Sequence, residues 1–306
     1  MKVHVIVVSW NAREETLGCL RNLEALPEPE LRVHVVDNGS TDGSAAAVAR
    51  EHPEADLLAF QDNRGFAAAA NAGLRRALEE GAEWFFLLNN DARLEDGALK
   101  ALLEAAERHP RAGLLGGRIY ADRERDVLWC CGVSLGWHFN LARLRGHGRR
   151  GRGRYEAEEE VDALTGCGLL IRREVLEQVG WLDEGFWVYV EDADYCLRAR
   201  EAGFAVVYVP EAVMEHAGAG STGGGYSPAR KYLTAHGSAL LARKHFRRRP
   251  GLALSLLIFD LLPLPLLLVS ALFRRRLQGA LAKGRGLRDG ILGRSADRSV
   301  VARGKS

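Results

Sequence analysis

Runs of apolar residues alternate with amphipathic segments through most of the chain. Apolar and β-branched stretches predict strands at residues 3–9, 31–36, 55–60, 84–88 and 112–119. Apolar positions at helical spacing predict helices between them, at residues 11–26, 66–80 and 94–108. Strands and helices that alternate in this way indicate an α/β fold with a doubly wound, mainly parallel sheet, in which ligands bind beyond the carboxyl ends of the strands.

The second half of the chain leaves this alternation and then returns to it. Residues 120–161 contain two tryptophans, a Gly/Arg run and an acidic run. We expect a mobile excursion over the active face that meets the acceptor, and a solvated loop is the alternative. Regular structure is predicted to resume with residues 164–172, a helix at 173–179 and a strand at 205–209 that ends at Pro210.

The C-terminal part is predicted to be helical and to contain one long apolar segment. A basic helix is expected at residues 228–246, and the apolar run at 251–273 reaches the length of about 20 residues that crosses a bilayer. Asp260 interrupts the run and arginine triplets flank it on both sides, so a single crossing would put one triplet on the wrong side. We therefore favour an interfacial or re-entrant broken helix pair over a buried helix pair or a true crossing.

Length and charge indicate an acidic body with a basic tail. The 306 residues are 47% hydrophobic, which allows a sizeable core. We expect a catalytic domain at residues 1–226 and a helical extension at 227–306. From residue 243 onward the chain has 15 Lys/Arg and 3 Asp/Glu, whereas residues 1–242 have 27 and 37. Such a tail suits an anionic membrane surface, and no signature of nucleic-acid binding accompanies it.

Cysteine content and the first residues point to a cytoplasmic location. The five cysteines are an odd number and none form a C-x-x-C pair, so we expect reduced core residues. The opening MKVHVIVVSWN shows a short apolar run with no small-residue cleavage site, which predicts a first strand and not a signal peptide.

The stretch at residues 180–203 is the most crowded with polar and aromatic groups. Four aromatic residues and two glycines precede Glu191, Asp192 and Asp194. These carboxylates are predicted to open a helix that stops at Gly203. Favourable helix-start electrostatics, about 0.3–1 kcal/mol for each carboxylate, is the alternative reason for them. Polar groups after two strands, and a histidine after this helix, favour instead a site for a divalent metal and a nucleotide diphosphate.

Those polar groups follow predicted strands, where an α/β sheet binds its ligands. Trp10 offers an aromatic face for a pyrimidine, and Asp37 can accept hydrogen bonds from a base or a ribose. The Asn-Asn-Asp triplet at 89–91 ends in a carboxylate of the kind that divalent cations share with phosphates, and His216 is the candidate nitrogen ligand. The loop at 62–66 opens a helix and can bring backbone N–H groups to the nucleotide. A core tryptophan, a turn, a capped helix and a structural histidine are the alternatives.

Five segments resemble glycosyltransferase family 2, the inverting, metal-dependent enzymes of the GT-A fold, and in particular its rhamnosyltransferase-like branch, which builds bacterial surface polysaccharides. They are VVSWN at 7–11, VVDNGSTDGS at 35–44, NRGFAAAANAG at 63–73, LLNNDARL at 87–94 and the long segment at 164–204. The last is the most specific of them. The piece RGLRDGILG at 285–293 resembles tails in the same branch.

The resemblance implies roles for individual residues. Nucleotide contacts are expected from Trp10, Asn11, Asp37, Asn63, Arg64, Gly65, Asn71, Asn89 and Asn90. A divalent metal, Mg²⁺ or Mn²⁺, is expected on Asp91 and His216. Asp192 is the expected general base, with Glu191 beside it. Acceptor contacts are assigned to Trp187, Tyr189 and Asp194.

Two positions depart from the pattern of that branch. Asn89 stands where an Asp-X-Asp motif would begin with aspartate, which leaves one anionic ligand fewer. The segment Thr234-Ala235-His236-Gly237 stands where the branch often carries an Arg-Asn pair.

We therefore expect inverting transfer of a sugar, with rhamnose a candidate, from a dTDP- or UDP-linked donor to a hydroxyl of a glycan or lipid-linked acceptor at the inner face of the cytoplasmic membrane. The oligomeric state stays open. A nicotinamide-dependent oxidoreductase is excluded because residues 9–14 follow the first strand without a G-x-G-x-x-G turn. Residue types alone leave open a non-catalytic sugar-nucleotide-binding or membrane-recruitment protein, and also a glycosidase.

Overall fold

A computed structural model describes residues 3–27, 31–121, 126–151, 153–218, 227–273, 277–297 and 299–302. They form two compact units. The sheet unit draws on Met1–Val133, Leu144–Leu182 and Tyr195–Gly218. The helical unit draws on Ser134–Arg143, Asp183–Asp194 and Ala219–Ser306. The expected division of the chain at residue 226 stays a prediction.

Strands and helices alternate along the first part of the chain. They are β1 (Val3–Ser9), α1 (Arg13–Ala25), β2 (Leu31–Asp37), α2 (Ser44–Glu51), β3 (Asp56–Ala59), α3 (Phe66–Glu79), β4 (Trp84–Asn89), β5 (Ala92–Leu94), α4 (Ala98–Arg108) and β6 (Ala112–Ala121). Next come β7 (Leu128–Cys130), β8 (Val133–Leu135), β9 (Ala142–Leu144), β10 (Glu159–Glu160), β11 (Gly168–Arg172), α5 (Arg173–Val179), η1 (Glu184–Phe186), α6 (Glu191–Glu201) and β12 (Ala205–His216). The last are α7 (Pro228–Lys244), α8 (Pro250–Leu256), η2 (Leu257–Leu261), α9 (Leu264–Phe273), α10 (Leu277–Leu292) and α11 (Ser299–Ala302).

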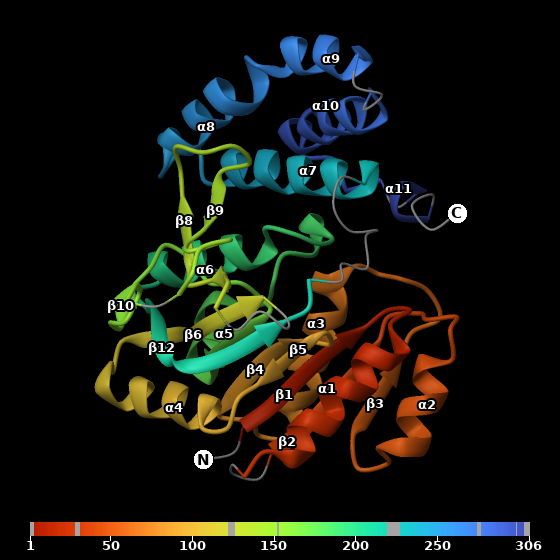
Figure 1. Cartoon of the computed structure of the whole chain (residues 1–306), viewed down its shortest axis with the longest axis vertical. Helices are drawn as coiled ribbons and strands as arrows, with labels where there is room; N and C mark the ends of the chain where they lie inside the picture. Colours follow the sequence, from red (N-terminus) through yellow and green to blue (C-terminus); the bar gives the residue numbers. More distant parts are fainter. Residues whose placement is uncertain are drawn as a thin grey trace. The chain divides into compact units, whose positions relative to one another are not determined.

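The sheet unit is built on one mainly parallel sheet (Figure 1). Its strands hydrogen-bond in the order β10-β12-β6-β11-β4-β1-β2-β3, with β5 paired to β12 and β7 paired to β6. Strands β3, β2, β1 and β4 are parallel, and so are β12 and β6. Strand β11 enters antiparallel between β4 and β6. The predicted α/β fold with a mainly parallel sheet is therefore confirmed.

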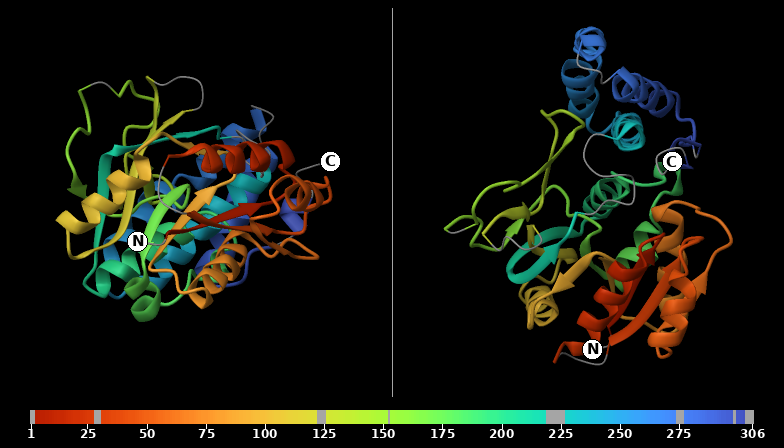
Figure 2. Two further views of the ribbon diagram at one scale, coloured as in Figure 1. Left: turned by 90° about the horizontal axis from the view of Figure 1, so that it is seen from below. Right: turned by 45° about the vertical axis from the view of Figure 1, so that its right-hand side comes forward.

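Helices cover both faces of the parallel strands (Figure 2). On one face α3 approaches the sheet at Gly73, where a Cβ atom would lie 2.5 Å from a methyl group of Ile6. On the other face α1 buries Cys19, whose thiol donates to the carbonyl of Asn89 over 3.8 Å. All five cysteines are buried and free, as expected. Strand β4 can be apolar almost throughout because both of its faces are covered.

The strand predicted to end at Pro210 continues to His216, so that prediction was wrong. The register between β12 and β6 shifts at residues 210–212, which form a bulge. A bulge accommodates a proline, which has no N–H to give to the ladder. Gly117 makes room for it, because a Cβ atom there would lie 1.8 Å from the carbonyl oxygen of Ala212. Beyond the bulge β12 pairs with β5, which carries His216 to the carboxyl edge of the sheet.

The excursion at residues 120–161 contains short strands and is not irregular throughout. Strand β7 pairs with β6, and β10 pairs with β12, so both extend the sheet unit. Strands β8 and β9 form a two-stranded hairpin, of which residues 134–143 belong to the helical unit. The expected contact of the excursion with an acceptor stays a prediction.

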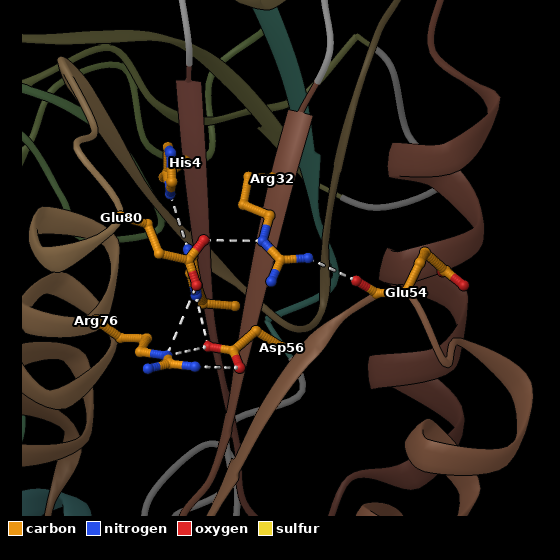
Figure 3. A network of polar contacts seen from close by, with 7 residues as sticks. His4, Arg32, Glu54, Asp56, Arg76 and Glu80 are labelled. Carbon is orange, nitrogen blue, oxygen red and sulfur yellow. Dashed lines mark hydrogen bonds and ion pairs between the residues drawn. The ribbon is translucent and has the colours of Figure 1, made fainter.

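A network of polar side chains joins β1, β2, β3 and α3 (Figure 3). The buried rings of His4 and His34 share a hydrogen bond of 2.8 Å between Nδ1 and Nε2. The other ring nitrogen of His34 bonds the carboxylate of Asp56 at 2.9 Å, and Arg76 donates to the same carboxylate at 3.0 Å. The buried histidines are thereby connected to charged groups that compensate one another, which makes their burial tolerable.

Helices α7 and α10 of the helical unit pack closely through glycines of the RGLRDGILG segment. A Cβ atom at Gly286 would lie 2.3 Å from the carbonyl oxygen of Tyr232, and one at Gly290 would lie 2.4 Å from that of His236. The hydroxyl of Tyr232 donates to the buried carboxylate of Asp289 over 3.1 Å. Missing side chains let the two backbones approach, and the buried hydrogen bond fixes their register.

The long apolar run of the helical unit is broken, as predicted. Helix α8 leads into the π-turn η2, where the N–H of Leu262 donates to the carbonyl of Leu257 over 2.9 Å. Pro263 and Pro265 follow and cannot donate backbone hydrogen bonds, so α9 starts as a separate helix. The relation of this segment to a membrane stays a prediction.

Two glycines on α10 give a matched test of the α7–α10 packing. Gly284→Ala meets only Leu264 at an ordinary 3.6 Å, so we expect it to stabilise the helix by about 0.5–1 kcal/mol. Gly286→Ala collides with backbone, so we expect a net destabilisation of about 1–3 kcal/mol. Denaturant unfolding followed by circular dichroism measures both changes. Equal stabilisation by the two variants would mean that the helices do not approach so closely.

Candidate active site

Asn11 holds together the loops that follow β1 and β2 at the carboxyl edge of the sheet. Its N–H donates to Ser40 Oγ at 2.9 Å, and its Oδ1 accepts from the N–H of Thr41 at 2.7 Å. Its φ of 49° is left-handed, which asparagine tolerates better than most residues. Trp10, next to it in the chain, is half-buried. The structure therefore fixes the backbone around Trp10 by bonds to the neighbouring loop.

Asp37 ends β2 and uses only one of its carboxylate oxygens within the described chain. Oδ1 accepts from the N–H of Ser40 at 2.9 Å, which is the turn bond considered as the alternative role of this residue. Oδ2 is buried and has no hydrogen-bond partner among the described residues, and the residue is 3% exposed. A buried carboxylate oxygen left without a donor is costly, so it indicates a ligand that supplies one. A ribose hydroxyl or a base N–H is such a donor.

The loop after β3 joins the same edge through Asn38. The amide nitrogen of Asn38 donates to Asn63 Oδ1 at 3.1 Å, and its Oδ1 accepts from the N–H of Arg64 at 2.9 Å. Gly39 permits this contact, because a Cβ atom there would lie 2.5 Å from the backbone of Asp62. Sequence reasoning missed Asn38, although its place directly after Asp37 at a strand end was a usable signal.

Other predicted nucleotide contacts have their own partners. Gly65 is the N-cap residue before α3 and has a φ of 90°, a conformation that favours glycine. The guanidinium of Arg64 lies over the ring of Phe60 at 4.4 Å. Asn71 is buried, and both its amide atoms bond the backbone of Leu182, at 2.9 and 3.0 Å. These bonds favour a positioning role for Asn71, and its contact with a nucleotide stays a prediction.

The structure brings together the two residues predicted as metal ligands. His216 Nε2 lies 3.1 Å from Asp91 Oδ1, with the side chains 8% and 11% exposed. The pairing of β12 with β5 sets His216 opposite Ala92, and the N–H of Ala217 donates to the carbonyl of Asp91 at 3.1 Å. The side-chain nitrogen of Asn89 lies 3.3 Å from the same Nε2.

The charge of His216 determines how these groups bond. Burial by itself lowers the pKa of His216. The neighbouring Cys167 and Asp91 raise the pKa by more than burial lowers it, and the result is about 10. The imidazolium therefore donates its Nε2–H to Asp91 at neutral pH. Because Nε2 cannot also accept a hydrogen bond, the amide of Asn89 is better placed with its oxygen toward the ring. In that orientation Asn89 offers a neutral oxygen ligand where the aspartate of an Asp-X-Asp motif is missing.

An aromatic ring contacts His216, and a hydroxyl group bonds the residue before Asp91. The ring of Trp129 on β7 lies edge-on to that of His216, with centroids 4.3 Å apart. The sequence had placed Trp129 in the excursion without connecting it to His216, because no local pattern links residues so far apart. Asn90 donates to the buried hydroxyl of Thr16 on α1 at 2.9 Å, which holds the loop after β4 against α1.

The donor set at Asp91 and His216 fits a divalent cation. Ligands at about 2.0–2.2 Å from one ion lie about 3 Å from each other when the angle between them is near 90°. The observed 3.1 Å between Oδ1 and Nε2 agrees with that spacing. Binding of a cation would require the ring to lose its Nε2 proton, as metal ligation by histidine does in general.

Two other groups within the described residues have ligand atoms close enough for an ion. They are His4 with His34 and Glu80, and Glu24 with His52 and Glu54. In the first, Arg32 donates to Glu80 at 3.0 Å, and the histidines bond each other (Figure 3). The carboxylate is thus already compensated by a guanidinium, and we assign that group a structural role.

In the helical unit, the segment before α6 has a strained backbone. Trp187, Tyr189 and Val190 have φ values of 64°, 72° and 73°. A β-branched residue at such a φ is a genuine outlier, and strain of this kind gathers at functional sites. Helix α7 holds the segment at Gly237, where a Cβ atom would lie 2.7 Å from the carbonyl oxygen of Tyr189. The departure at residues 234–237 therefore includes a glycine that this contact requires.

Burial separates the two adjacent carboxylates at the start of α6. Glu191 is 4% exposed, and its Oε2 has no partner among the described residues. Burial, with a smaller effect from Asp192, raises the pKa of Glu191 well above its usual value, so Glu191 holds its proton to a higher pH than an exposed glutamate does. Asp192 is only half-buried, and its Oδ1 accepts from the N–H of Ala193 at 2.7 Å. Of the two, Asp192 is the one suited to accept a proton.

Asp194 is fully buried in an ionic cluster. Lys244 Nζ lies 2.9 Å and His245 Nε2 3.0 Å from its Oδ1, both at the end of α7. Lys244 also bonds Asp183 at 2.6 Å. These contacts favour a structural role in joining α6 to α7, and the assigned acceptor contact of Asp194 stays a prediction.

A mainly parallel sheet whose carboxyl edge carries Asp37, Asp91 and His216 has the arrangement in which α/β proteins commonly bind ligands. The family model described as Glycosyl transferase family 2 matches residues 4–180, more than half of the chain. The chain belongs to glycosyltransferase family 2. The expected glycosyltransferase class is thereby confirmed.

Curated relatives support this assignment. A Mycobacterium tuberculosis protein named N-acetylglucosaminyl-diphospho-decaprenol L-rhamnosyltransferase is 33% identical over 252 residues, which cover 76% of this chain and 80% of that protein. The dTDP-rhamnosyl transferase RfbF of Shigella flexneri is 26% identical over 251 residues, which cover 79% and 80%.

Solved structures confirm the GT-A fold. A mannosyltransferase from Pyrobaculum calidifontis, in complex with GDP-Man and Mn²⁺, aligns with a TM-score of 0.58 and 20% identity over 94% of this chain and 86% of its own. GalNAc-T7 with UDP, GalNAc and Mn²⁺ aligns with a TM-score of 0.57 and 11% identity over 71% and 44%. At these identities the likeness concerns the fold.

The raised pKa of Glu191 predicts a pH-dependent stability. The unfolded chain ionises this carboxyl at a pH of about 4.3, whereas the folded chain holds the proton to a higher pH, so rising pH above about 4 favours unfolding. Because glutamine cannot ionise, we expect the stability of Glu191→Gln relative to wild type to increase as the pH rises from about 4 to neutrality. Urea unfolding at a series of pH values measures it, with exposed Glu107→Gln as the control. A difference that does not change with pH would show that Glu191 is ionised when folded.

Proposed function

We propose that the chain transfers L-rhamnose, with inversion, from a dTDP-linked donor to a hydroxyl of a lipid-diphosphate-linked glycan during synthesis of a bacterial surface polysaccharide. The names of the two relatives supply the donor and acceptor classes. A lipid-linked acceptor supports a reaction at a membrane, and the five free, buried cysteines favour its inner, reducing face. A UDP-linked hexose, which the sequence left open, is the alternative donor.

The pairing of Asp91 with His216 is the observation that carries this proposal. Asp91 lies just beyond the end of β4 and His216 is the last residue of β12, and only β1 separates β4 from the strand that ends at Asp37. A nucleotide whose ribose or base meets Asp37 would extend its diphosphate along this edge toward Asp91. The orphaned oxygen of Asp37 and the two ligand atoms thus match the two ends of one nucleoside diphosphate.

The chemistry is a single displacement at the anomeric carbon. The acceptor oxygen bonds to that carbon from the face opposite the diphosphate, the carbon–oxygen bond to the diphosphate breaks, and the configuration inverts. Asp192 accepts the hydroxyl proton during this step. Glu191 is the weaker candidate, because it is buried and its raised pKa keeps the proton bound to a higher pH.

A divalent cation, Mg²⁺ or Mn²⁺, held by Asp91 and His216 would neutralise charge on the departing diphosphate. Asn89 would add a neutral oxygen to this set. Together with the bonds that fix the loops of Asn11 and Asn38, these residues orient the donor and leave its sugar exposed to attack.

Removing the base should affect turnover and not donor binding. We expect Asp192→Asn to lower kcat by about 10²–10⁴-fold with the KM for dTDP-rhamnose little changed. Steady-state release of dTDP in the presence of a lipid-linked acceptor analogue measures both constants. Asp37→Asn is the matched control, with a higher KM expected because an amide nitrogen replaces the orphaned oxygen. Unchanged kcat in Asp192→Asn would move the base to another residue.

Donor binding should depend on the cation. We expect excess EDTA to abolish transfer, and Mn²⁺ to tighten dTDP binding to wild type much more than to Asp91→Asn. Isothermal titration with dTDP, with and without Mn²⁺, measures this difference independently of turnover. Full activity in excess chelator would reject Asp91 as a ligand. Turnover of UDP-hexoses in preference to dTDP-rhamnose would reject the proposed donor while keeping the family assignment.

A further inference from the structure

The helical unit exposes a stripe of large apolar side chains. On α8, η2 and α9 these side chains are 38–75% exposed, and they are Leu254, Leu257, Ile258, Leu262, Leu266, Val269 and Leu272. They follow one another at spacings of one, three or four residues, which puts them on one side of the broken helix. Trp137 and Phe139 of the β8–β9 hairpin are 63% and 52% exposed. We call these nine residues the apolar platform.

The hairpin and the broken helix form one surface. The ring of Phe259 on η2 contacts both hairpin aromatics, with centroid distances of 6.4 Å to Trp137 and 5.7 Å to Phe139. Ser255 Oγ donates to the carbonyl of Gly136 at 2.9 Å. The backbone polar groups of the hairpin are therefore bonded to the helix, and its aromatic side chains stay exposed.

The acidic residue inside the apolar run, Asp260, is buried and bonded to other residues of the helical unit. Asp260 is 2% exposed, and its Oδ1 lies 2.7 Å from Lys283 Nζ on α10. Its Oδ2 accepts from the N–H of Asn140 in the hairpin at 2.9 Å. A helix that crossed a bilayer on its own would have to separate this pair and take a carboxylate into hydrocarbon, which is strongly unfavourable. The run of Pro250–Leu272 has the length and composition for a crossing, but these bonds hold it against α10 and the hairpin.

Positive charge adjoins the platform in the sequence. Exposed Arg247 and Arg248 stand immediately before α8, and three further arginines stand at 274–276. Apolar side chains with cations at both ends of the segment match a lipid surface with anionic headgroups, where the side chains enter the headgroup–acyl boundary.

We propose that the apolar platform lies in the interface of an anionic bilayer, with α8 and α9 along the membrane surface and not across it. The functional reason for this binding rests on the proposed function, because a lipid-linked acceptor must be reached from the membrane surface. The binding itself rests on the exposed side chains, the buried Asp260 and the flanking arginines.

Vesicle flotation of the full chain tests this assignment. The vesicles are phosphatidylglycerol with phosphatidylcholine in equal parts, or phosphatidylcholine alone. We expect strong binding to the anionic vesicles only, and a loss of about tenfold or more in Leu262→Glu/Leu266→Glu. The control Ile291→Glu/Leu292→Glu adds the same charge at exposed apolar positions on α10, and we expect it to bind like wild type.

Two further readouts distinguish the mode of binding. Tryptophan quenching by brominated lipids should fall markedly in Trp137→Phe, and alkaline carbonate should release the bound chain. Resistance to carbonate would overturn the proposal in favour of a crossing. Absent vesicle binding, together with dimers that the Leu262→Glu/Leu266→Glu change dissociates, would overturn it in favour of a second copy of the chain on the platform.

Failure of the membrane-binding proposal can be distinguished from failure of the proposed transferase function. Transfer from dTDP-rhamnose to a soluble acceptor analogue should be retained in Leu262→Glu/Leu266→Glu, because these residues belong to no catalytic or donor-binding contact. Vesicle binding by a chain that lacks transferase activity would support the platform and reject the function. Transferase activity in a chain that does not bind vesicles would support the proposed function and reject the platform.

Discussion

The pairing of Asp91 with His216 is the constraint on which the carboxyl edge of the sheet depends. An imidazolium and a carboxylate that are both about nine-tenths buried are acceptable only when they meet each other. To reach Asp91, β12 must run through the bulge at residues 210–212 and then pair with β5. Gly117 leaves space for the bulge because it has no side chain, and Pro210 fits in the bulge because it has no N–H to donate to the neighbouring strand. The edge of Trp129 then closes one side of the histidine ring.

Around this pair the loops of the sheet unit are fixed by side chains that bond backbone. The amide oxygens of Asn11 and Asn38 each accept a hydrogen bond from the backbone of a neighbouring loop. One carboxylate oxygen of Asp37 accepts a hydrogen bond within its own turn. Such bonds make a rigid edge out of chain that has no secondary structure of its own. Rigidity matters here because a ligand that meets preformed donors and acceptors loses less entropy on binding. The second oxygen of Asp37 has no hydrogen-bond partner among the described residues, which makes it a candidate contact for a ligand.

The helical unit uses burial in two opposite ways. At Glu191 burial without an ionic partner favours the neutral carboxyl and raises its pKa. At Asp260 and Asp194 buried carboxylates are instead paired with Lys283 and Lys244, which lie within 2.9 Å or less. Burial therefore has different consequences for a carboxylate with a cationic partner and for one without. The left-handed backbone at residues 187–190 is maintained by the packing of α7 against it.

The sequence by itself determined the alternation of strands and helices, the mainly parallel sheet, the break in the apolar run and the family, because each follows from local periodicity or from a contiguous motif. It placed Asp91 and His216 in one site through their positions after predicted strands and through the family resemblance. The sequence did not predict that β12 extends past Pro210, because a bulge depends on the partner strand and on Gly117, which is far away in the chain. Tertiary structure alone decided that Glu191 is buried while Asp192 is half-exposed, that Asn71 bonds Leu182, and that Lys283 neutralises Asp260. These outcomes depend on which residues distant in sequence come to lie beside a charge, and no local pattern contains that information.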